Sequence, residues 1–124
     1  MIVLATMLAC SDTRGAEPAA PAVPEYLGIQ SRLIDWELVN QRVWMRGAVE
    51  RNDIVQYSRC AAAQYALTIG YGFVRHVRTK VTQEGGIWQA DAVYSITSAL
   101  PPGTRTIDAE VVVADCLELG IPTV

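Results

Sequence analysis

The folded part of the chain opens with two segments in which apolar and polar residues alternate, residues 33–39 and 42–49. Alternation with a period of two is typical of strands that bury one face. A tight turn at residues 40–41 would pair the two segments antiparallel. Apolar residues then meet across the pair, as Trp36 and Met45 do, and such contacts stabilise a sheet. The pattern therefore predicts a first hairpin with its turn at 40–41.

A long helix is predicted next, over residues 54–69. This segment contains no glycine or proline and is rich in alanine, a strong helix former. Its apolar residues recur at helical spacing along one stripe. Asn52 or Asp53 can cap the first turn. Gly70 stands where a residue in the left-handed conformation commonly ends a helix.

A second hairpin is predicted around the two glycines at 85–86, because paired glycines favour the tight turns of hairpins. Residues 87–99 alternate most regularly, and residues 72–82 less so. Pairing across the glycines places Val77 opposite Tyr94. Both side chains then belong to the buried face of the sheet.

The last segment, residues 107–119, is predicted to form a second helix. Thr106 or Asp108 can cap it, and Gly120 ends it. The three valines at 111–113 are β-branched, so a fifth strand stays open as the alternative. The whole pattern predicts an α+β fold with an antiparallel four-stranded sheet in ββαββα order and helices on one face.

The beginning of the chain follows a different pattern. Residues 1–9 are apolar but shorter than the about 20 residues that span a bilayer, and they resemble the end of a signal peptide. Cys10 follows small residues, as in a lipoprotein attachment site, although Met7 stands where that pattern usually has leucine. The alternative is a short apolar strand followed by an ordinary cysteine.

Three parts of the chain are therefore expected. Residues 1–9 are a signal-peptide remnant, residues 10–24 hold the lipid-attachment cysteine and a linker rich in proline and alanine, and residues 25–124 form a single α+β domain. Because no basic segment precedes the apolar run, we expect the native reading frame to begin upstream of Met1.

Charge and cysteine content refine this picture. The net charge of −3 and the pI near 5.0 argue against a nucleic-acid partner. Three cysteines are an odd number, but lipid on Cys10 leaves Cys60 and Cys116 as a pair on the two predicted helices. We expect a disulfide between them, which suits an oxidising compartment. Two buried free thiols, or zinc ligands together with His76, are the alternatives.

Catalytic chemistry is sparse in this sequence. His76 is the only histidine, and its neighbours Arg75, Arg78 and Lys80 are cationic, so no carboxylate stands ready to orient it as a general base. The cysteines and the histidine lack the close pairwise spacing of structural zinc sites. We therefore expect no catalytic residue, no metal site and no cofactor.

One group of residues suggests a binding surface instead. Arg42, Trp44 and Arg46 fall on the polar face of the predicted second strand, and Arg78 and Lys80 of the second hairpin are expected to share this outer face. A large aromatic side chain between two arginines is a composition enriched at binding hot spots. The alternative is an ordinary solvated sheet face, because Asp35, Glu37 and Asp91 interleave with these cations.

At the helix and its exit the chain resembles a group of small proteobacterial lipoproteins of unknown function. The residues that match this group in spacing are Tyr57, Ala62, Ala63, Gln64, Gly70 and Tyr71, together with Arg46 and Gly47 before the helix and Asp108 and Ala109 at the last one. The chain departs from the group at Ala61, where arginine is usual, and at Phe73, which comes one place early. The resemblance covers about residues 33–119. It implies a location in the cell envelope and no activity.

Taken together, the sequence predicts a non-enzymatic, lipid-anchored protein of the cell envelope with a binding or structural role. Lipid on Cys10 would hold it in the outer membrane, facing the periplasm. Its partner would be an envelope protein or a cell-wall component. A small periplasmic hydrolase or metal-dependent enzyme is the alternative, and a soluble intracellular domain with Cys10 unmodified is a third reading.

Overall fold

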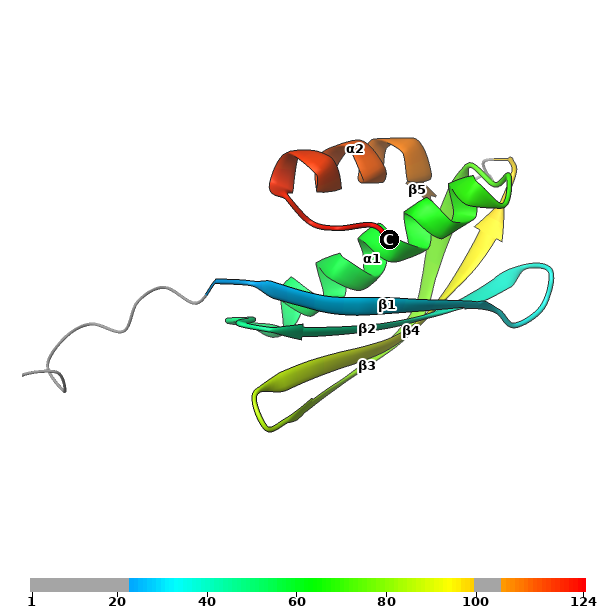
Figure 1. Ribbon diagram of the computed structural model, residues 1–124. Helices are drawn as coiled ribbons and strands as arrows, with labels where there is room; N and C mark the ends of the chain where they lie inside the picture. Colours follow the sequence, from blue (N-terminus) through cyan, green and yellow to red (C-terminus); the bar gives the residue numbers. More distant parts are fainter. Residues whose placement is uncertain (1–22, 100–105) are drawn as a thin grey trace, which may run out of the picture.

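The computed structural model describes residues 23–99 and 106–124, so the predicted lipid-attachment site at Cys10 lies outside the described residues. It contains one antiparallel sheet and two helices (Figure 1). In chain order the elements are β1 (Glu25–Leu33), β2 (Leu38–Arg46), α1 (Arg51–Thr68), β3 (Phe73–Glu84), β4 (Ile87–Thr97), β5 (Ile107–Asp108) and α2 (Ala109–Leu119). Neighbouring strands in the sheet follow the order β1-β2-β4-β3-β5.

The two helices lie on the same side of the sheet (Figure 1). Helix α1 packs against β1, β2, β3 and β4, and α2 packs against α1 and β5. The predicted α+β class with helices on one face is therefore confirmed. The predicted four strands are wrong, because the described residues form five, in the order ββαβββα.

The first hairpin is shifted from its predicted position. Its strands are β1 and β2, and the chain reverses at residues 34–37 rather than 40–41. The carboxylate of Asp35 accepts hydrogen bonds from the backbone N–H groups of Glu37 (2.8 Å) and Leu38 (3.0 Å), which is how an aspartate side chain stabilises a turn. Trp36 sits on this turn and is 75% exposed, so it does not pack opposite Met45.

Residues Asn40 and Gln41 lie inside β2, where neighbouring strands supply hydrogen-bond partners for the Asn40 amide nitrogen and the Gln41 amide oxygen. Asn40 Nδ2 donates to Asp91 Oδ1 at 2.6 Å and to the carbonyl oxygen of Ala92 at 3.2 Å. Gln41 Oε1 accepts a hydrogen bond from Ser31 Oγ at 2.6 Å. Buried polar groups are tolerated when they are hydrogen-bonded. These two consecutive polar residues therefore belong to a central strand and not to a turn.

Helix α1 begins earlier than predicted. Glu50 is the N-cap, not Asn52 or Asp53, and Asp53 takes the third helical position of a capping box. The Asp53 carboxylate accepts from the backbone N–H groups of Val49 (2.7 Å) and Glu50 (3.1 Å), so these two donors are satisfied before the helix starts. Gly70 follows the helix with φ of 94°, as its predicted role requires.

Strands β3 and β4 form the predicted glycine hairpin, and Val81 pairs with Ala90. The expected pairing of Val77 with Tyr94 is wrong. His76 pairs with Tyr94 and Arg78 pairs with Val93, so Val77 is an extra residue in a β-bulge and is 52% exposed. A bulge of this kind changes which side chains of a strand share a face.

The last segment contains both of the structures left open from the sequence. A two-residue strand, β5, pairs with the start of β3, and α2 follows it directly. The carboxylate of Asp108 caps α2 by accepting from the backbone N–H groups of Glu110 and Val111. Gly120 ends the helix in the left-handed conformation, with φ of 71°. Both predicted signals, Asp108 and Gly120, are confirmed.

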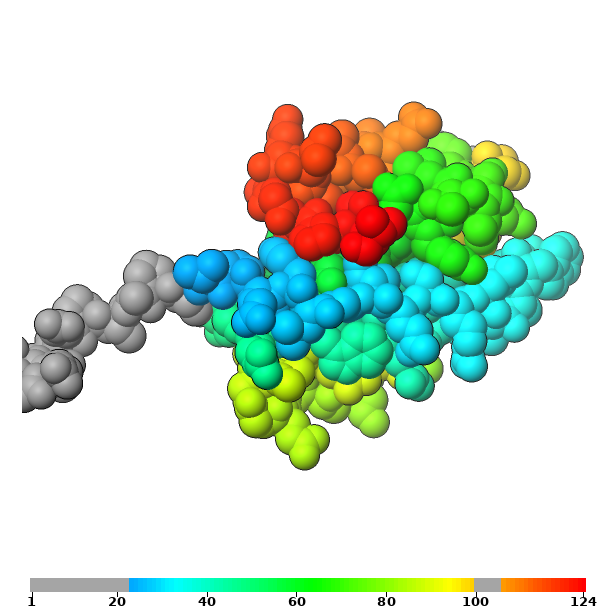
Figure 2. Space-filling model, viewed as in Figure 1, coloured from blue at the N-terminus to red at the C-terminus, as the bar shows by residue number. Residues whose placement is uncertain are grey.

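The core lies between α1 and the sheet. Four alanines and Ser58 of α1 are buried, and the small side chains of Ala62 and Ala66 pack with residues of β2 and β4. Tyr26 on β1 contacts Tyr57 edge-to-face, with ring centroids 4.7 Å apart. Figure 2 shows the C-terminal residues, in red, packed directly beside β1, in blue. The C-terminal tail thus covers the side of α1 next to β1.

The predicted disulfide joins the two helices. Cys60 and Cys116 are both buried, their Cα atoms lie 6.1 Å apart, and their sulfur atoms are bonded. The bond closes a loop between residues 56 positions apart. Helix α2 packs mainly on α1 and β5, and the disulfide is a covalent tie that adds to this packing.

Replacing both cysteines, Cys60→Ala with Cys116→Ala, should lower the free energy of unfolding by about 4 kcal/mol, because the unfolded chain regains the entropy of an open loop of this length. Urea denaturation of the oxidised protein and of the double variant measures this difference. Wild type in the presence of a reductant is the control and should match the double variant within about 1 kcal/mol. Equal stability of oxidised wild type and double variant would contradict the assignment.

Candidate binding face of the sheet

The side chains of Arg42, Trp44 and Arg46 lie on the sheet face turned away from the helices. Alternate residues of β2, among them Val43 and Met45, are fully buried against α1. The three predicted residues point the other way, with Arg42 and Arg46 exposed and Trp44 half-buried. We call the side of the sheet opposite α1 and α2 the outer face.

Strand pairing places the outer-face residues in rows that run across the sheet. One row holds Arg32, Asn40, Val93 and Arg78, and the next holds Gln30, Arg42, Asp91 and Lys80. A third row holds Gly28, Trp44, Gln89 and Thr82. Residues far apart in the chain therefore meet on one surface around Trp44.

The bulge at Val77 determines which residues of β3 join this face. Arg75 pairs with Ser95 and Arg78 with Val93, and both partners alternate with residues buried against α1. Without the extra residue, a regular ladder would put Arg75 and Arg78 on opposite faces. With it, Arg75, Arg78 and Lys80 all lie on the outer face.

The outer face is more basic than the rest of the domain. Of the eight Lys and Arg residues that the structure describes, six lie on it: Arg32, Arg42, Arg46, Arg75, Arg78 and Lys80. Three acidic residues share it: Glu25, Glu84 and Asp91. Helix α2 carries Glu110, Asp115 and Glu118 and no cation. The chain's negative net charge thus coexists with a positive sheet face.

Two of the six cations are paired with carboxylates. Arg42 Nε lies 3.7 Å from Asp91 Oδ2, and an Arg46 guanidinium nitrogen lies 3.8 Å from Glu25 Oε1. Among the residues that the structure describes, no ion pair involves the other four, Arg32, Arg75, Arg78 and Lys80. These four cations lie to either side of the Arg42–Asp91 ion pair, and they can bind an external anion.

A hollow of about 390 Å³ opens beside Trp44. Thr82, Glu84, Ile87 and Gln89 complete its lining, so it lies between β2 and the end of the β3–β4 hairpin. An aromatic ring flanked by hydroxyl, amide and carboxylate groups offers one flat apolar surface and several hydrogen-bonding groups. Sequence reasoning found Trp44 but not the hollow, because the other residues belong to a separate hairpin.

His76 lies on the side of the sheet that faces α1, not on the outer face. Its ring contacts Tyr94 edge-to-face at 5.4 Å between centroids, and its Nε2 lies 2.7 Å from Thr79 Oγ1. Burial raises the pKa of the Tyr94 phenol, while a hydrogen bond with Ser58 opposes that rise. Neither contact of the imidazole is a carboxylate that could orient it as a general base.

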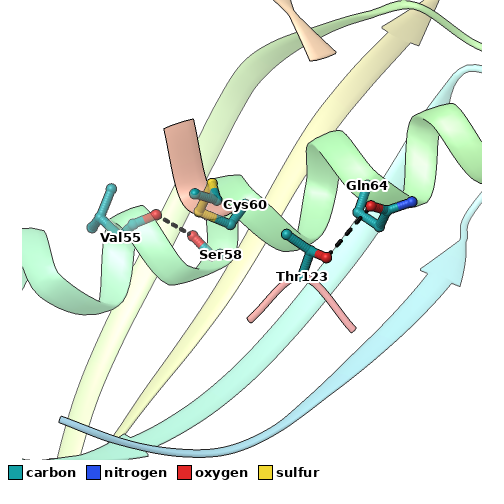
Figure 3. The surroundings of a disulfide bond; sticks show 6 residues. Val55, Ser58, Cys60, Gln64 and Thr123 are labelled. Carbon is teal, nitrogen blue, oxygen red and sulfur yellow. Dashed lines mark hydrogen bonds between the residues drawn. A yellow bond between two sulfur atoms is a disulfide. The ribbon is translucent and has the colours of Figure 1, made fainter. Parts of the chain in front are cut away.

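Cys60 and Cys116 do not provide metal ligands, because each sulfur is bonded to the other. In the described part of the chain, no group of three or more His, Cys, Asp or Glu side chains is placed to hold a metal ion. A small cavity of about 120 Å³ lies beside the disulfide, between α1 and α2. Figure 3 shows Cys60 on α1, on the turn that follows the Ser58–Val55 hydrogen bond.

A second cavity, of about 330 Å³, lies between β1, α1 and the C-terminal tail. Ser31, Gln64 and Thr123 supply polar groups to its lining, and Thr123 Oγ1 donates to Gln64 Oε1 at 3.4 Å (Figure 3). Ser31 also donates to Gln41, whose amide is fully buried and whose Nε2 has no hydrogen-bond partner. An unpartnered buried amide lowers stability.

Comparison with known proteins identifies the family. The model of the YNQ4 C-terminal domain matches residues 26–120. The chain belongs to the YNQ4 C-terminal domain family. The match begins in β1 and ends just after α2, so it covers both helices, the sheet and the outer face apart from Glu25.

One curated relative is an uncharacterized 26.9 kDa protein in the nqo8 5′ region of Paracoccus denitrificans. It is 28% identical over 111 residues, which cover 90% of this chain but 41% of the relative. The chain thus spans less than half of the length of this relative. No solved structure matches the chain.

The Gln41 amide yields a stability prediction. Ser31→Ala should lower the free energy of unfolding by about 1–3 kcal/mol, because Gln41 Oε1 loses its donor while it stays buried. Adding Gln41→Met should recover most of that loss, because the methionine fills similar space without polar groups. Urea denaturation of wild type, the single variant and the double variant tests this. A double variant less stable than Ser31→Ala alone would show that the amide stabilises the fold.

Proposed function

We propose that this domain is a non-enzymatic, lipid-anchored component of the cell envelope that binds another envelope component through its outer face. The observation that carries the proposal is the outer face itself. The helices leave it uncovered, it gathers six cations, and Trp44 lines a hollow at one side of it. Exposed surfaces of this composition are typical of binding sites.

The anchor in this proposal is lipid on Cys10, followed by the linker of residues 10–24. The first strand begins at Glu25, directly after that linker. Backbone atoms of Val23 lie so close to Gly47 that any side chain at position 47 would collide with them. The chain therefore enters the domain beside the end of β2. A tether at this point is compatible with an outer face that stays open.

One further observation supports an envelope location, since the disulfide between Cys60 and Cys116 suits an oxidising compartment such as the periplasm. In the described residues, neither helix is long and apolar enough to cross a membrane. A hydrolase has less support, because the described contacts of His76 include no carboxylate.

Lipid on Cys10 is the first expected outcome. The protein produced from its native upstream region in a Gram-negative host should carry acyl mass on Cys10 and should fractionate with the outer membrane. Intact-mass spectrometry and membrane fractionation measure both properties. Cys10→Ser is the control and should release the protein into the periplasm. An unmodified Cys10 in the wild-type protein would contradict the anchor.

Binding through Trp44 is the second expected outcome. In a Cys10→Ser background, the chain should sediment with isolated envelope fragments, and Trp44→Ala should reduce the bound fraction at least tenfold. Trp44 is only half-buried, so the free energy of unfolding should change by less than about 2 kcal/mol. Trp36→Ala is the matched control, because Trp36 is 75% exposed on the distant β1–β2 turn. An equal effect of both substitutions would contradict a specific role for Trp44.

A further inference from the structure

The four cations of the outer face that form no ion pair lie on β1 and β3, on either side of the ion pair between Arg42 and Asp91. Arg32 lies on β1, and Arg75, Arg78 and Lys80 follow one another along β3. Adjacent strands are about 4.8 Å apart, so the row from Arg32 to Arg78 spans about 14 Å of the sheet. The cations of β3 therefore form a line along one strand rather than one compact anion pocket.

This line leads directly to the Trp44 hollow. Thr82 and Glu84 are the next outer-face residues of β3 after Lys80, and both line the hollow. A ligand that lies along β3 would meet Arg75, Arg78 and Lys80 first and the aromatic ring next. The ligand that fits is therefore long, carries negative charge, and offers a flat surface for the ring.

The side chains that line the hollow are suited to binding a sugar ring. The C–H face of a pyranose ring packs on a flat aromatic ring, and its hydroxyl groups bond with side chains such as Gln89, Thr82 and Glu84. Guanidinium groups bind carboxylates through paired hydrogen bonds, which suits Arg75 and Arg78 for acidic sugars. The charge and the shape of the face thus favour the same class of polymer.

Two other polyanions fit this face less well. A lipid surface is best contacted by aromatic side chains that project from the protein, whereas Trp44 is half-buried beside a hollow. Nucleic acid carries densely spaced phosphates, which Glu25, Glu84 and Asp91 would repel. A polymer of acidic sugars carries at most one carboxylate per sugar, a lower charge density than a DNA duplex, so fewer of its charges meet these acids.

We propose that the outer face binds an anionic polysaccharide strand, with carboxylate groups on Arg75, Arg78 and Lys80 and one sugar ring on Trp44. This inference rests on the proposed function and names the class of partner for that same face. The ion pair between Arg42 and Asp91 lies at the centre of the face. Arg32 lies about 14 Å from Arg78 across the sheet, outside the path of this ligand.

Calorimetric titration of the full chain, carrying Cys10→Ser, with an oligogalacturonate of about ten sugars tests the proposal. Binding should be saturable and should weaken at least tenfold between about 50 and 500 mM NaCl, because salt screens the charge contacts. Arg78→Gln with Lys80→Gln should weaken it about tenfold or more. Arg51→Gln with Arg59→Gln removes the same charge from α1, the helix side of the domain, and should leave binding within about twofold.

Trp44→Phe and Trp44→Leu separate the ring from simple apolar bulk. The phenylalanine variant should keep most of the affinity, and the leucine variant should lose at least tenfold, with both variants shown to be folded by circular dichroism. A maltodextrin of equal length should not bind detectably, because it is neutral. Vesicles of phosphatidylglycerol and phosphatidylcholine should bind more weakly than the acidic oligosaccharide.

Several outcomes would overturn the inference. They are equal binding of maltodextrin, equal losses in the helix-side and sheet-side charge variants, preference for the vesicles, and no binding of the oligogalacturonate. If Trp44→Ala still abolishes retention on envelope fragments while the oligogalacturonate does not bind, the polysaccharide inference is wrong and the proposed function stands. If retention is also independent of Trp44, both are wrong.

Discussion

The structure depends on a one-sided sheet, because α1 covers one face of four strands and no helix in the described residues covers the other. Each strand must present apolar side chains to α1 and can present polar ones outward. Small residues on α1 let the helix approach β2 and β4 closely, and the Cys60–Cys116 bond keeps α2 on the back of α1. Side chains on the outer face are therefore not required for the core, and this face can carry the arginines and the lysine.

Local signals predicted the parts of the fold that local chemistry determines. The two glycines fix the β3–β4 hairpin, Asp108 and Gly120 fix the ends of α2, and the cysteine pair fixes the contact between the helices. The first hairpin was predicted wrongly because Asn40 and Gln41 resemble turn residues. Their partners, Ser31, Asp91 and the Ala92 carbonyl, come from other strands, and no local pattern could reveal them.

The candidate site was predictable to the same extent. Alternation along one strand placed Arg42, Trp44 and Arg46 on the outer face. Arg32 joins them only once β1 is recognised as a strand, and the placement of Ile29 and Leu33 on one side, with Gln30 and Arg32 on the other, is the signal that was available. Arg75 joins them only because of the bulge at Val77, which depends on the pairing of β3 with β4.

The register of β3 against β4 is the central claim of this account, because it brings Arg75, Arg78 and Lys80 to one face beside the Trp44 hollow. Cross-strand proton contacts measured by nuclear magnetic resonance test it most directly, since directly opposed residues in an antiparallel pair have Cα atoms about 4.5–5.5 Å apart. The account predicts contacts between Arg75 and Ser95, His76 and Tyr94, and Arg78 and Val93, with no residue opposite Val77. Contacts between Val77 and Tyr94 and between Arg75 and Ile96 would show a regular ladder, would move Arg75 to the helix side, and would contradict it.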